Sequence, residues 1–320
     1  MKILVGDIGG THCRLAMAQL NGAHVDLADV RHFRNAGYPG LEAILAQYLE
    51  GAPPPESTCL AVAGPTDGRR VHFTNLAWHI DTATLEKGLG LKHVGLVNDF
   101  SAVGWGLNAL RPEDVATLQE GQPEANGVRA AVGAGTGLGV SISIPREGRH
   151  QPIPSEGGHI GFAPLNEEQD RLLDYLRGLH GRVSVERLVS GPGVIDLYRF
   201  CAREAGEQHT PLLSAATPAQ AISQAALAAQ DMTAVHAMKL FVGIYGQVAG
   251  DIALLTQARG GIYLAGGIPP KILPLLRGPE FLSGFHAKGR FSYWIRTVPV
   301  AVVLDDAIGL RGAAVAAIQP

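Results

Sequence analysis

This sequence has no long run of like-charged residues and no long apolar run, and these absences exclude several classes of protein. Its 320 residues include 26 basic and 29 acidic side chains, with a net charge of −3 and no long run of one sign. We therefore expect no nucleic-acid partner and no binding to a membrane surface. No uninterrupted apolar run reaches the 18 residues of a spanning helix, and nothing at the start is typical of a signal peptide. These absences favour a soluble, cytoplasmic protein.

Cysteine is scarce as well. The three cysteines, Cys13, Cys59 and Cys201, are odd in number and far apart in the chain. Their spacing fits no zinc motif, and scattered cysteines are typical of proteins in a reducing compartment. The cysteines therefore favour a cytosolic protein without a zinc site.

Glycine, in contrast, is abundant: 41 of the 320 residues are glycine, nearly twice the average share of about 7%. The glycines have no Gly-X-Y period, which excludes a collagen-like chain. With 46% hydrophobic and 17% charged residues, the chain is able to bury a large core. The length predicts two domains or one large one, and the glycines predict many turns or close approaches of the backbone to a ligand.

The order of the predicted elements indicates an α/β protein, because short apolar strands alternate with helices of longer period. Strands are predicted near residues 2–5, 14–20, 24–33, 58–63, 94–97, 138–144, 261–265 and 299–304. Helices are predicted at residues 41–50, 100–107, 167–180, 184–187, 194–205, 215–231 and 234–258. A polar stretch between residues 110 and 126 predicts a domain boundary there.

The first glycine-rich motif, Gly6-Asp7-Ile8-Gly9-Gly10-Thr11, follows an apolar strand. Gly9 and Gly10 allow the main chain to approach phosphate oxygens with its N–H groups, and Thr11 adds a hydroxyl. Asp7 is a candidate magnesium ligand, directly or through water. The alternative is an ordinary hairpin turn. A Rossmann dinucleotide fingerprint is rejected, because the residues that follow read as a returning strand and not as a helix.

A second motif repeats this pattern. Residues 132–137 resemble residues 5–11, and the repeat contains Gly135, Thr136 and Gly137. Two such halves predict two turns that face one ligand in a cleft. A third turn, at Gly266 and Gly267, follows an apolar strand and would let a flat adenine lie against backbone. A flexible loop and an ordinary turn are the respective alternatives.

Polar side chains with acid–base or ligand chemistry occur at three further places. Asn98 and Asp99 end an apolar strand, where a rigid element would aim a general base, although capping of the next helix is an equal alternative. Glu156 and His159 flank a glycine pair, so both could reach one small polar ligand, with an incidental polar loop as the alternative. Glu186, taken alone, reads as a surface charge.

Taken in order, these motifs resemble the bacterial glucokinases that lack a structural zinc. The resemblance covers nearly the whole chain and rests on the following segments: Gly6 to Thr11, Thr74-Asn75 with Trp78, Asn98 to Phe100, Gly133 to Gly139, Glu156 to His159, Ser184 to Gly193, Ala265 to Ile268 and Gly309 to Gly312. The related repressor/kinase group carries a cysteine-rich zinc motif, which three scattered cysteines cannot supply. Several motifs in one order are far more specific than any one of them.

The resemblance implies a two-lobed actin-like ATPase (ribonuclease H-like) fold with duplicated mixed-sheet α/β domains and a central cleft. It implies a small domain of residues 1–110 plus 301–320 and a large domain of residues 111–300. The implied reaction is ATP-dependent phosphorylation of the 6-hydroxyl of glucose in a homodimer, with Mg²⁺ bound near Asp7. Asp99 matches the general base, and the sugar ligands match Asn75, Asn98, Glu156, His159 and Glu186. The matched nucleotide-binding residues are Gly6, Asp7, Gly9, Gly10, Thr11, Gly135, Thr136, Gly137, Gly266 and Gly267.

Three positions depart from the pattern of these relatives. His12 and Cys13 stand where asparagine and alanine are common, and Ser155 stands where glycine is common. None of the three removes a proposed catalytic group. A kinase for another hexose (mannose, fructose or an N-acetylated amino sugar) remains an alternative, and so does a sugar-binding regulator without catalysis.

Overall fold

The structure is a computed structural model, and it describes residues 1–22, 24–51, 53–72 and 78–318. The chain forms two compact units. The first comprises Met1–Asp114, Ser143–Pro154 and Asp305–Pro320, and the second comprises Val115–Ile142 and Ser155–Leu304. The predicted domain ranges, 1–110 plus 301–320 and 111–300, stay a prediction.

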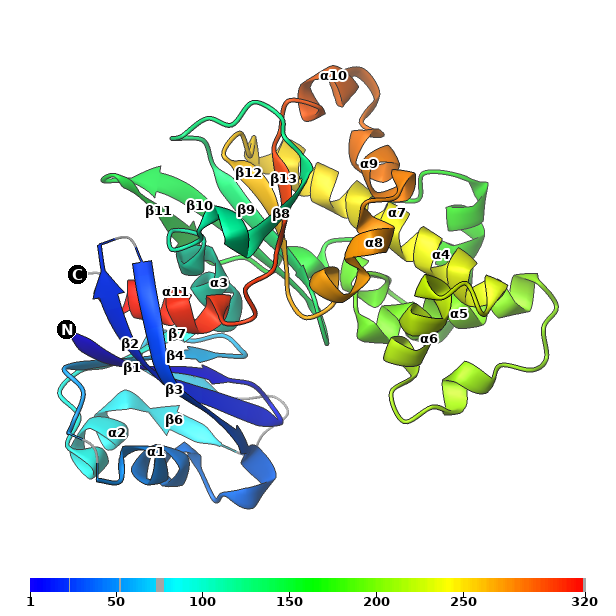
Figure 1. The fold of residues 1–320 in the computed structure, drawn as a ribbon. Coiled ribbons are helices and arrows are strands. Elements are labelled where there is room, and N and C mark those ends of the chain that lie inside the picture. The colour runs from blue at the N-terminus through cyan, green and yellow to red at the C-terminus, as the bar shows by residue number, and fades with distance from the viewer. Residues whose placement is uncertain (23, 52, 73–77, 319–320) are drawn as a thin grey trace. The chain divides into compact units, whose positions relative to one another are not determined.

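A five-stranded mixed sheet forms the centre of the first unit (Figure 1). Its strands are β1 (Lys2–Ile8), β2 (His12–Asn21), β3 (His24–Arg34), β4 (Ser57–Val62) and β7 (Val94–Asn98), in the order β3-β2-β1-β4-β7. The first three strands pair antiparallel, whereas β1, β4 and β7 run parallel. The segment after Thr11 is thus a strand that returns along β1, which confirms the rejection of a Rossmann fold. A small hairpin of β5 (Arg70–His72) and β6 (His79–Asp81) stands apart from this sheet.

Each face of this sheet is covered by its own helices. Because side chains alternate along a strand, Ile3 and Val5 of β1 face one layer while Leu4 and Ile8 face the other. One core includes side chains of α1 (Leu41–Leu49) and α2 (Thr82–Leu89), and the other includes those of α3 (Asp99–Gly106) and α11 (Ile308–Ala316).

The crossing of α3 and α11 explains a glycine of the C-terminal motif. A Cβ at Gly312 would lie 1.7 Å from the carbonyl oxygen of Ala102. Gly312 is therefore required by helix packing, and the last motif of the resemblance is structural at this position.

The second unit contains most of a six-stranded sheet of order β11-β10-β9-β12-β13-β8. The strands are β8 (Val115–Gln119), β9 (Arg129–Ala134), β10 (Leu138–Arg146), β11 (Arg149–Ile153), β12 (Gly261–Ala265) and β13 (Val300–Val303). The end of β10 and all of β11 group with the first unit. Strands β9, β12 and β13 run parallel, as β1, β4 and β7 do. The first five strands have the same order as the sheet of the first unit, so the short sequence repeat marks a repeat of topology.

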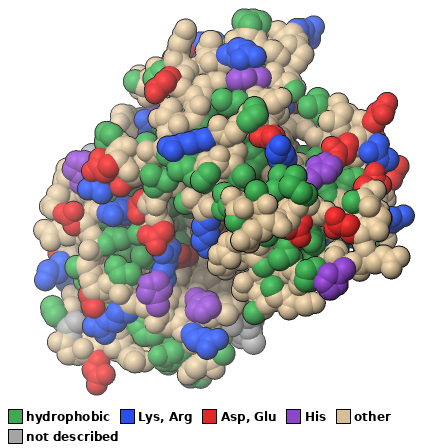
Figure 2. All heavy atoms as spheres, turned by 45° about the vertical axis from the view of Figure 1, so that its right-hand side comes forward, with side chains coloured by type: hydrophobic (Ala, Val, Ile, Leu, Met, Phe, Trp, Pro, Cys, Tyr) green, Lys and Arg blue, Asp and Glu red, His purple; other side chains and the backbone are tan. Residues whose placement is uncertain are grey.

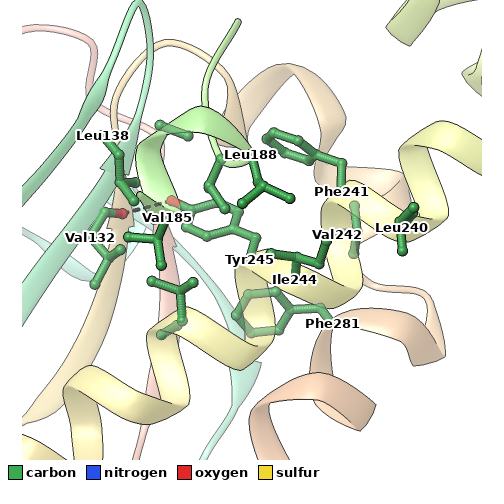
Figure 3. Close-up of a cluster of buried hydrophobic side chains, with 14 of the residues drawn as sticks. Val132, Leu138, Val185, Leu188, Leu240, Phe241, Val242, Ile244, Tyr245 and Phe281 are labelled. Atoms are coloured by element: carbon green, nitrogen blue, oxygen red, sulfur yellow. Dashed lines mark hydrogen bonds between the residues drawn. The ribbon is translucent and has the colours of Figure 1, made fainter. Parts of the chain in front are cut away.

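Helices of the second unit surround one continuous core. They are α4 (Glu167–His180), α5 (Gly191–Glu204), α6 (Pro218–Leu227), α7 (Met232–Thr256), α8 (Leu273–Leu276), α9 (Pro279–His286) and α10 (Ser292–Ile295). Figure 3 shows Tyr245 of α7 reaching from this core to β9, where its hydroxyl donates to the carbonyl of Val132 at 2.6 Å. The central helix is thereby tied to the strand that leads into the second glycine turn.

Helix α7 is the one helix in the described part of the chain that is long and apolar enough to cross a membrane by length and composition. In the structure, however, 72% of its most apolar window is buried against the rest of the protein. Its apolar character is therefore accounted for by its place in the core.

Several predicted helix ends differ from the observed ones for local reasons. Asp231 was placed at the end of a helix, but its side chain accepts from the N–H of Ala234 at 2.8 Å and caps α7. Pro218 starts α6, since proline lacks the N–H that a helix interior needs. The helix predicted at 184–187 is a short 3-10 helix, η4 (Val185–Arg187).

The surface agrees with the charge count. Figure 2 shows basic and acidic side chains intermingled over the face that it presents, without a large area of one sign. Such a surface gives no support to a nucleic-acid footprint on this face.

Candidate active site

The first glycine turn joins β1 to β2 at residues 9–11. The N–H of Gly9 donates to the carbonyl of His12 at 3.0 Å, which closes the turn. Among the described residues, the N–H groups of Gly10 and Thr11 donate to no protein acceptor. Two successive N–H groups without an internal partner form an anion-binding surface. The turn therefore has the donors that the sequence predicts for a phosphate.

Asp7 lies in β1, two residues before this turn. Its Oδ2 accepts a hydrogen bond from Arg14 Nη2 at 2.9 Å, and its side chain is 32% exposed. In the part of the chain that the structure describes, no group of three or more His, Cys, Asp or Glu side chains could hold a metal ion. Arg14 occupies one oxygen of Asp7, so this single carboxylate would hold Mg²⁺ only with most of the ion's other ligands supplied by water or phosphate.

Gly6 has a different role from its neighbours in the motif. It is buried inside β1, where an added Cβ would lie 2.7 Å from a methyl carbon of Leu60 and 2.9 Å from one of Leu15. Packing between strands thus explains Gly6, and the structure places it away from the turn that offers free N–H groups.

Asn98 and Asp99 lie where β7 ends and α3 begins. Asn98 is the N-cap of α3: its Oδ1 accepts from the N–H groups of Phe100 and Ser101, and its Nδ2 donates to the carbonyl of Gly64 at 3.3 Å. Asp99 occupies the first helical position, partly exposed. A carboxylate is favoured there by the N-terminal end of the helix dipole. The capping alternative is thus confirmed for Asn98, while Asp99 is held by two rigid elements.

The second glycine turn joins β9 to β10 and is supported from two sides. Gly135 donates to the carbonyl of Gly137 at 2.9 Å, and its own carbonyl accepts from the N–H of Gly191 at 2.8 Å. The carboxylate of Glu186 accepts from the N–H of Leu138 at 3.0 Å. Glu186 is therefore no simple surface charge: it binds the backbone at the end of the turn, and its side chain is 31% exposed.

Glu156, His159 and Glu186 form one cluster in the second unit. His159 Nδ1 lies 3.8 Å from Glu186 Oε1, and His159 Nε2 lies 4.0 Å from Glu156 Oε2. The glycine pair of the motif makes this possible, because a Cβ at Gly158 would lie 1.9 Å from the carbonyl oxygen of Leu138. Glu156 and His159 are 73% and 59% exposed, so their polar atoms are open to a ligand. Three predicted sugar ligands are thus brought together beside the second turn.

A pocket of about 510 Å³ opens next to the same turn, entirely within the second unit. Gly135, Thr136 and Gly267 line it, so two separate glycine motifs meet here. Gly266 has a φ of +87°, and a Cβ on it would lie 2.5 Å from the carbonyl oxygen of Ala134. Glycine is required at this position both for its conformation and for its close approach to β9.

The pocket is also lined by Gly191, Pro192 and Ile268 of the named motifs, but sequence reasoning missed its remaining residues. Its other polar residues are Thr217, Gln220, Ser223 and Lys271, and its apolar ones include Val194, Ile195, Met238 and Ile272. They come from α5, α6, α7 and η6 (Pro269–Ile272), and no local motif joins elements so far apart in the chain. The one available signal was Lys271, a cation four residues after the Gly266-Gly267 turn.

The remaining predicted positions are placed as follows. Asn75 lies outside the described residues. His12 is exposed at the start of β2. Cys13 is fully buried, and burial together with the charge of Asp7 raises the pKa of its thiol to about 12. The Ser155 hydroxyl accepts from the N–H of Gly157 at 3.1 Å and so supports the loop of Glu156.

Comparison with known proteins agrees with this geometry. The model of the glucokinase family matches residues 4–320. A glucokinase from Nostoc punctiforme is 39% identical, over 98% of this chain and 98% of its own length. Among solved structures, a glucokinase from an Antarctic psychrotroph has a TM-score of 0.88 and 32% identity, over 99% of this chain and 98% of that one.

A more distant structure supports the fold alone. A ROK family glucokinase from Streptomyces griseus, solved in complex with glucose and AMPPNP, has a TM-score of 0.69 at 22% identity and covers all of both chains. These neighbours have the two-lobed actin-like ATPase fold, which confirms the predicted fold class. The chain belongs to the glucokinase family, and it is a hexose kinase that phosphorylates glucose with ATP.

Proposed function

We propose that the chain transfers the γ-phosphoryl group of ATP to the 6-hydroxyl of glucose, with Asp99 as the general base. The hydroxyl oxygen attacks the γ-phosphorus as the bond to the β–γ bridging oxygen breaks, and ADP leaves. Asp99 accepts the hydroxyl proton during this attack. Phosphoryl transfer depends mainly on positioning and on neutralising charge, so one fixed carboxylate is enough acid–base chemistry.

The observation that carries this proposal is the place of Glu186. Its carboxylate binds the N–H of Leu138 at the end of the second glycine turn and also lies 3.8 Å from the imidazole of His159. Side chains that could bind sugar hydroxyls therefore lie directly beside the second glycine turn, which could bind a nucleotide. A carboxylate can accept from two hydroxyls at once, which makes Glu156 and Glu186 good sugar ligands. Asn98 retains one N–H for the sugar besides its capping role.

The nucleotide is assigned to the two turns and the pocket beside the second. The purine and ribose would occupy the pocket lined by Gly135, Thr136 and Gly267, whose walls are largely apolar. The N–H groups of Gly10 and Thr11 would bind phosphate oxygens. Asp7 would hold Mg²⁺ through a water molecule, since its Oδ1 makes no hydrogen bond within the described residues. When bound, Mg²⁺ supplies positive charge to the phosphate oxygens.

The test is ATP-dependent product formation over a panel of sugars. Glucose, mannose, fructose, N-acetylglucosamine and N-acetylmannosamine would each be offered with ATP, and glucose would also be offered with ADP and with polyphosphate. We expect the highest kcat/KM for glucose with ATP, and loss of turnover on removal of Mg²⁺ with a chelator. Faster turnover of another hexose would reassign the acceptor. Glucose binding without any turnover would favour the regulator.

We also propose a cytoplasmic homodimer. The resemblance supports the assembly, and the scattered cysteines together with the lack of a spanning apolar run support the location. Sedimentation at several concentrations measures the first, and fractionation of the source cells measures the second. A monomer at every concentration would contradict the dimer.

A further inference from the structure

Asn35, a residue outside every glycine motif, makes two hydrogen bonds to the first turn. It begins the short 3-10 helix η1 (Asn35–Gly37), directly after β3. Its backbone N–H donates to the carbonyl of Thr11 at 3.0 Å, and its side-chain Nδ2 donates to the carbonyl of Gly9 at 2.8 Å. The side chain is only 2% exposed, so these contacts are shielded from water.

The side-chain bond to Gly9 determines which way the turn presents the N–H of Gly10, and the backbone bond to Thr11 restrains the other end of the turn. A trans peptide is planar, so its carbonyl and its N–H point in opposite directions. The carbonyl of Gly9 shares a peptide with the N–H of Gly10, and binding the first to Asn35 aims the second away from Asn35. The carbonyl of Thr11 is held in the same way, so both ends of the turn are restrained. The N–H groups of Gly10 and Thr11, which donate to no acceptor in the described chain, lie between these two anchors.

The hydrogen bond of Asn35 to Gly9 is accompanied by an unfavourable feature of the same amide. Its Oδ1 is buried and has no hydrogen-bond partner among the described residues. Reversing the amide would place Oδ1 against the carbonyl of Gly9, so the observed orientation is the one that the turn permits. A leucine of similar size would leave no unpaired acceptor. A buried acceptor without a partner calls for an explanation, and the hydrogen bond of the same amide to Gly9 supplies one.

The segment that carries Asn35 is itself held on both sides. Phe33 of β3 packs against Tyr38 edge to face, with ring centroids 6.0 Å apart. The N–H of Tyr38 donates to the carbonyl of Asn35, and the Tyr38 hydroxyl donates to Gln47 of α1 at 2.8 Å. Asn35 therefore links the first turn to β3 and, through Tyr38, to α1.

We propose that Asn35 is a positioning residue for the phosphoryl donor, which aims the N–H groups of Gly10 and Thr11 at a phosphate of the nucleotide. This inference rests on the proposed function only in assigning the nucleotide phosphates to the first turn. The proposed function assigns phosphates to the first turn, and the inference adds that Asn35 orients that turn.

The experiment compares Asn35→Leu and Asn35→Asp with a matched variant, Asn108→Leu. Asn108 belongs to the same unit, and its amide also binds backbone, at Trp105 and His150. We expect both Asn35 variants to raise the KM for ATP and the Kd of AMPPNP by about tenfold or more, with the KM for glucose nearly unchanged. Asn108→Leu should lower the melting temperature without a selective change in nucleotide binding.

Equal changes in both KM values, or an unchanged Kd of AMPPNP, would overturn the proposal. If neither Asn35 variant folds, amide hydrogen exchange in the wild-type protein decides, because bound AMPPNP must protect the amides of Gly10 and Thr11. A lack of protection there would overturn the proposal as well. AMPPNP binding needs no sugar turnover, so a wild-type protein that fails to phosphorylate glucose would contradict the proposed function and leave this measurement valid.

Discussion

The two glycine turns occupy equivalent places in their sheets but are held by different chemistry. Gly9 and Gly135 each donate to a carbonyl of their own turn, at 3.0 Å and 2.9 Å. The carbonyl of Gly9 then binds a side chain, that of Asn35, whereas the carbonyl of Gly135 binds the backbone N–H of Gly191. The glycine carbonyl is thus held by a replaceable side-chain amide in the first turn and by a main-chain N–H in the second.

The difference extends to the chemistry that surrounds each turn. In the first unit, the N–H groups of Gly10 and Thr11 donate to no acceptor in the part of the chain that the structure describes, and the unit also carries the proposed base, Asp99. In the second unit, Glu186 takes the N–H of Leu138 and belongs to the cluster with His159. We infer that the first unit mainly handles charge in the reaction, while the second mainly binds and orients.

The largest expected effect tests this division directly. Asp99→Asn removes the proton acceptor, so kcat should fall by a factor of about 10² to 10⁴ while glucose still binds.

Glu156→Gln weakens a charge-assisted hydrogen bond, so the KM for glucose should rise about tenfold or more, with a smaller change for ATP. Steady-state kinetics and glucose titration measure both. A near-normal kcat in Asp99→Asn, or a KM change confined to ATP in Glu156→Gln, would break the comparison.

A smaller effect separates two glycines of the second turn. An added Cβ at Gly137 would lie 2.5 Å from Glu186 Oε2, whereas a Cβ at Gly135, which lines the pocket, would meet nothing within 4 Å. Gly137→Ala should therefore displace Glu186 and raise the KM for glucose about tenfold, and Gly135→Ala should raise that for ATP.

The matched control for this pair is Gly178→Ala on α4, where an added Cβ also meets nothing within 4 Å. We expect it to leave both KM values unchanged. If Gly135→Ala and Gly137→Ala shift the same KM, the two sides of the turn do not serve separate ligands.

The smallest expected effect concerns acid stability. Burial lowers the pKa of His286 in α9 below its usual 6.5, and Arg296 adds to this. Gln119 uses its Nε2 on two carbonyls, so its Oε1 accepts from His286 Nε2–H at 2.6 Å. The unfolded chain therefore binds a proton more readily than the folded one, and stability should decline as pH falls through about 6.5.

The comparison with the first unit sharpens this prediction. Arg111 lowers the pKa of Asp114 below 3.8, so the stability from that pair is present above this value and is lost only in stronger acid. In melting curves between about pH 7.5 and 5.5, His286→Gln should flatten the decline, while Asp114→Asn should leave its slope unchanged. An equal slope in wild type and His286→Gln would contradict the assignment.

Local sequence signals predicted much of the fold. The helix at 167–180 has the predicted bounds, because Asn166 caps one end and Gly181 follows the other. The repeat of residues 5–11 at 132–137 predicted two halves that each open with a strand, a glycine turn and a strand, as β1–β2 and β9–β10 do. Strand pairing that brings β11 next to α3 has no comparable local signal, and neither does the grouping of residues 143–154 with the first unit.

The residues of the candidate site also fall into those that local sequence predicts and those that it does not. Glycine turns and the Glu156–His159 pair are visible in the sequence because their residues are neighbours in the chain. Asn35 and Lys271 were missed, since their meaning depends on elements that meet only in the folded chain. Glu186 read as a surface charge in isolation, and its hydrogen bond to Leu138 spans 48 residues.

Glu186 contacts both the backbone N–H of Leu138 and the imidazole of His159, and this matters for any attempt to engineer the kinase toward another sugar. A residue that both binds a backbone turn and is proposed to bind the acceptor sugar is a poor site for library mutagenesis, because each replacement would alter two proposed ligand sites together. The side chain of Glu156 is 73% exposed and makes no hydrogen bond to either glycine turn within the described residues, so its replacement would alter only the proposed sugar site. Selectivity would therefore evolve fastest at Glu156 and its loop, with Glu186 left intact as part of the scaffold.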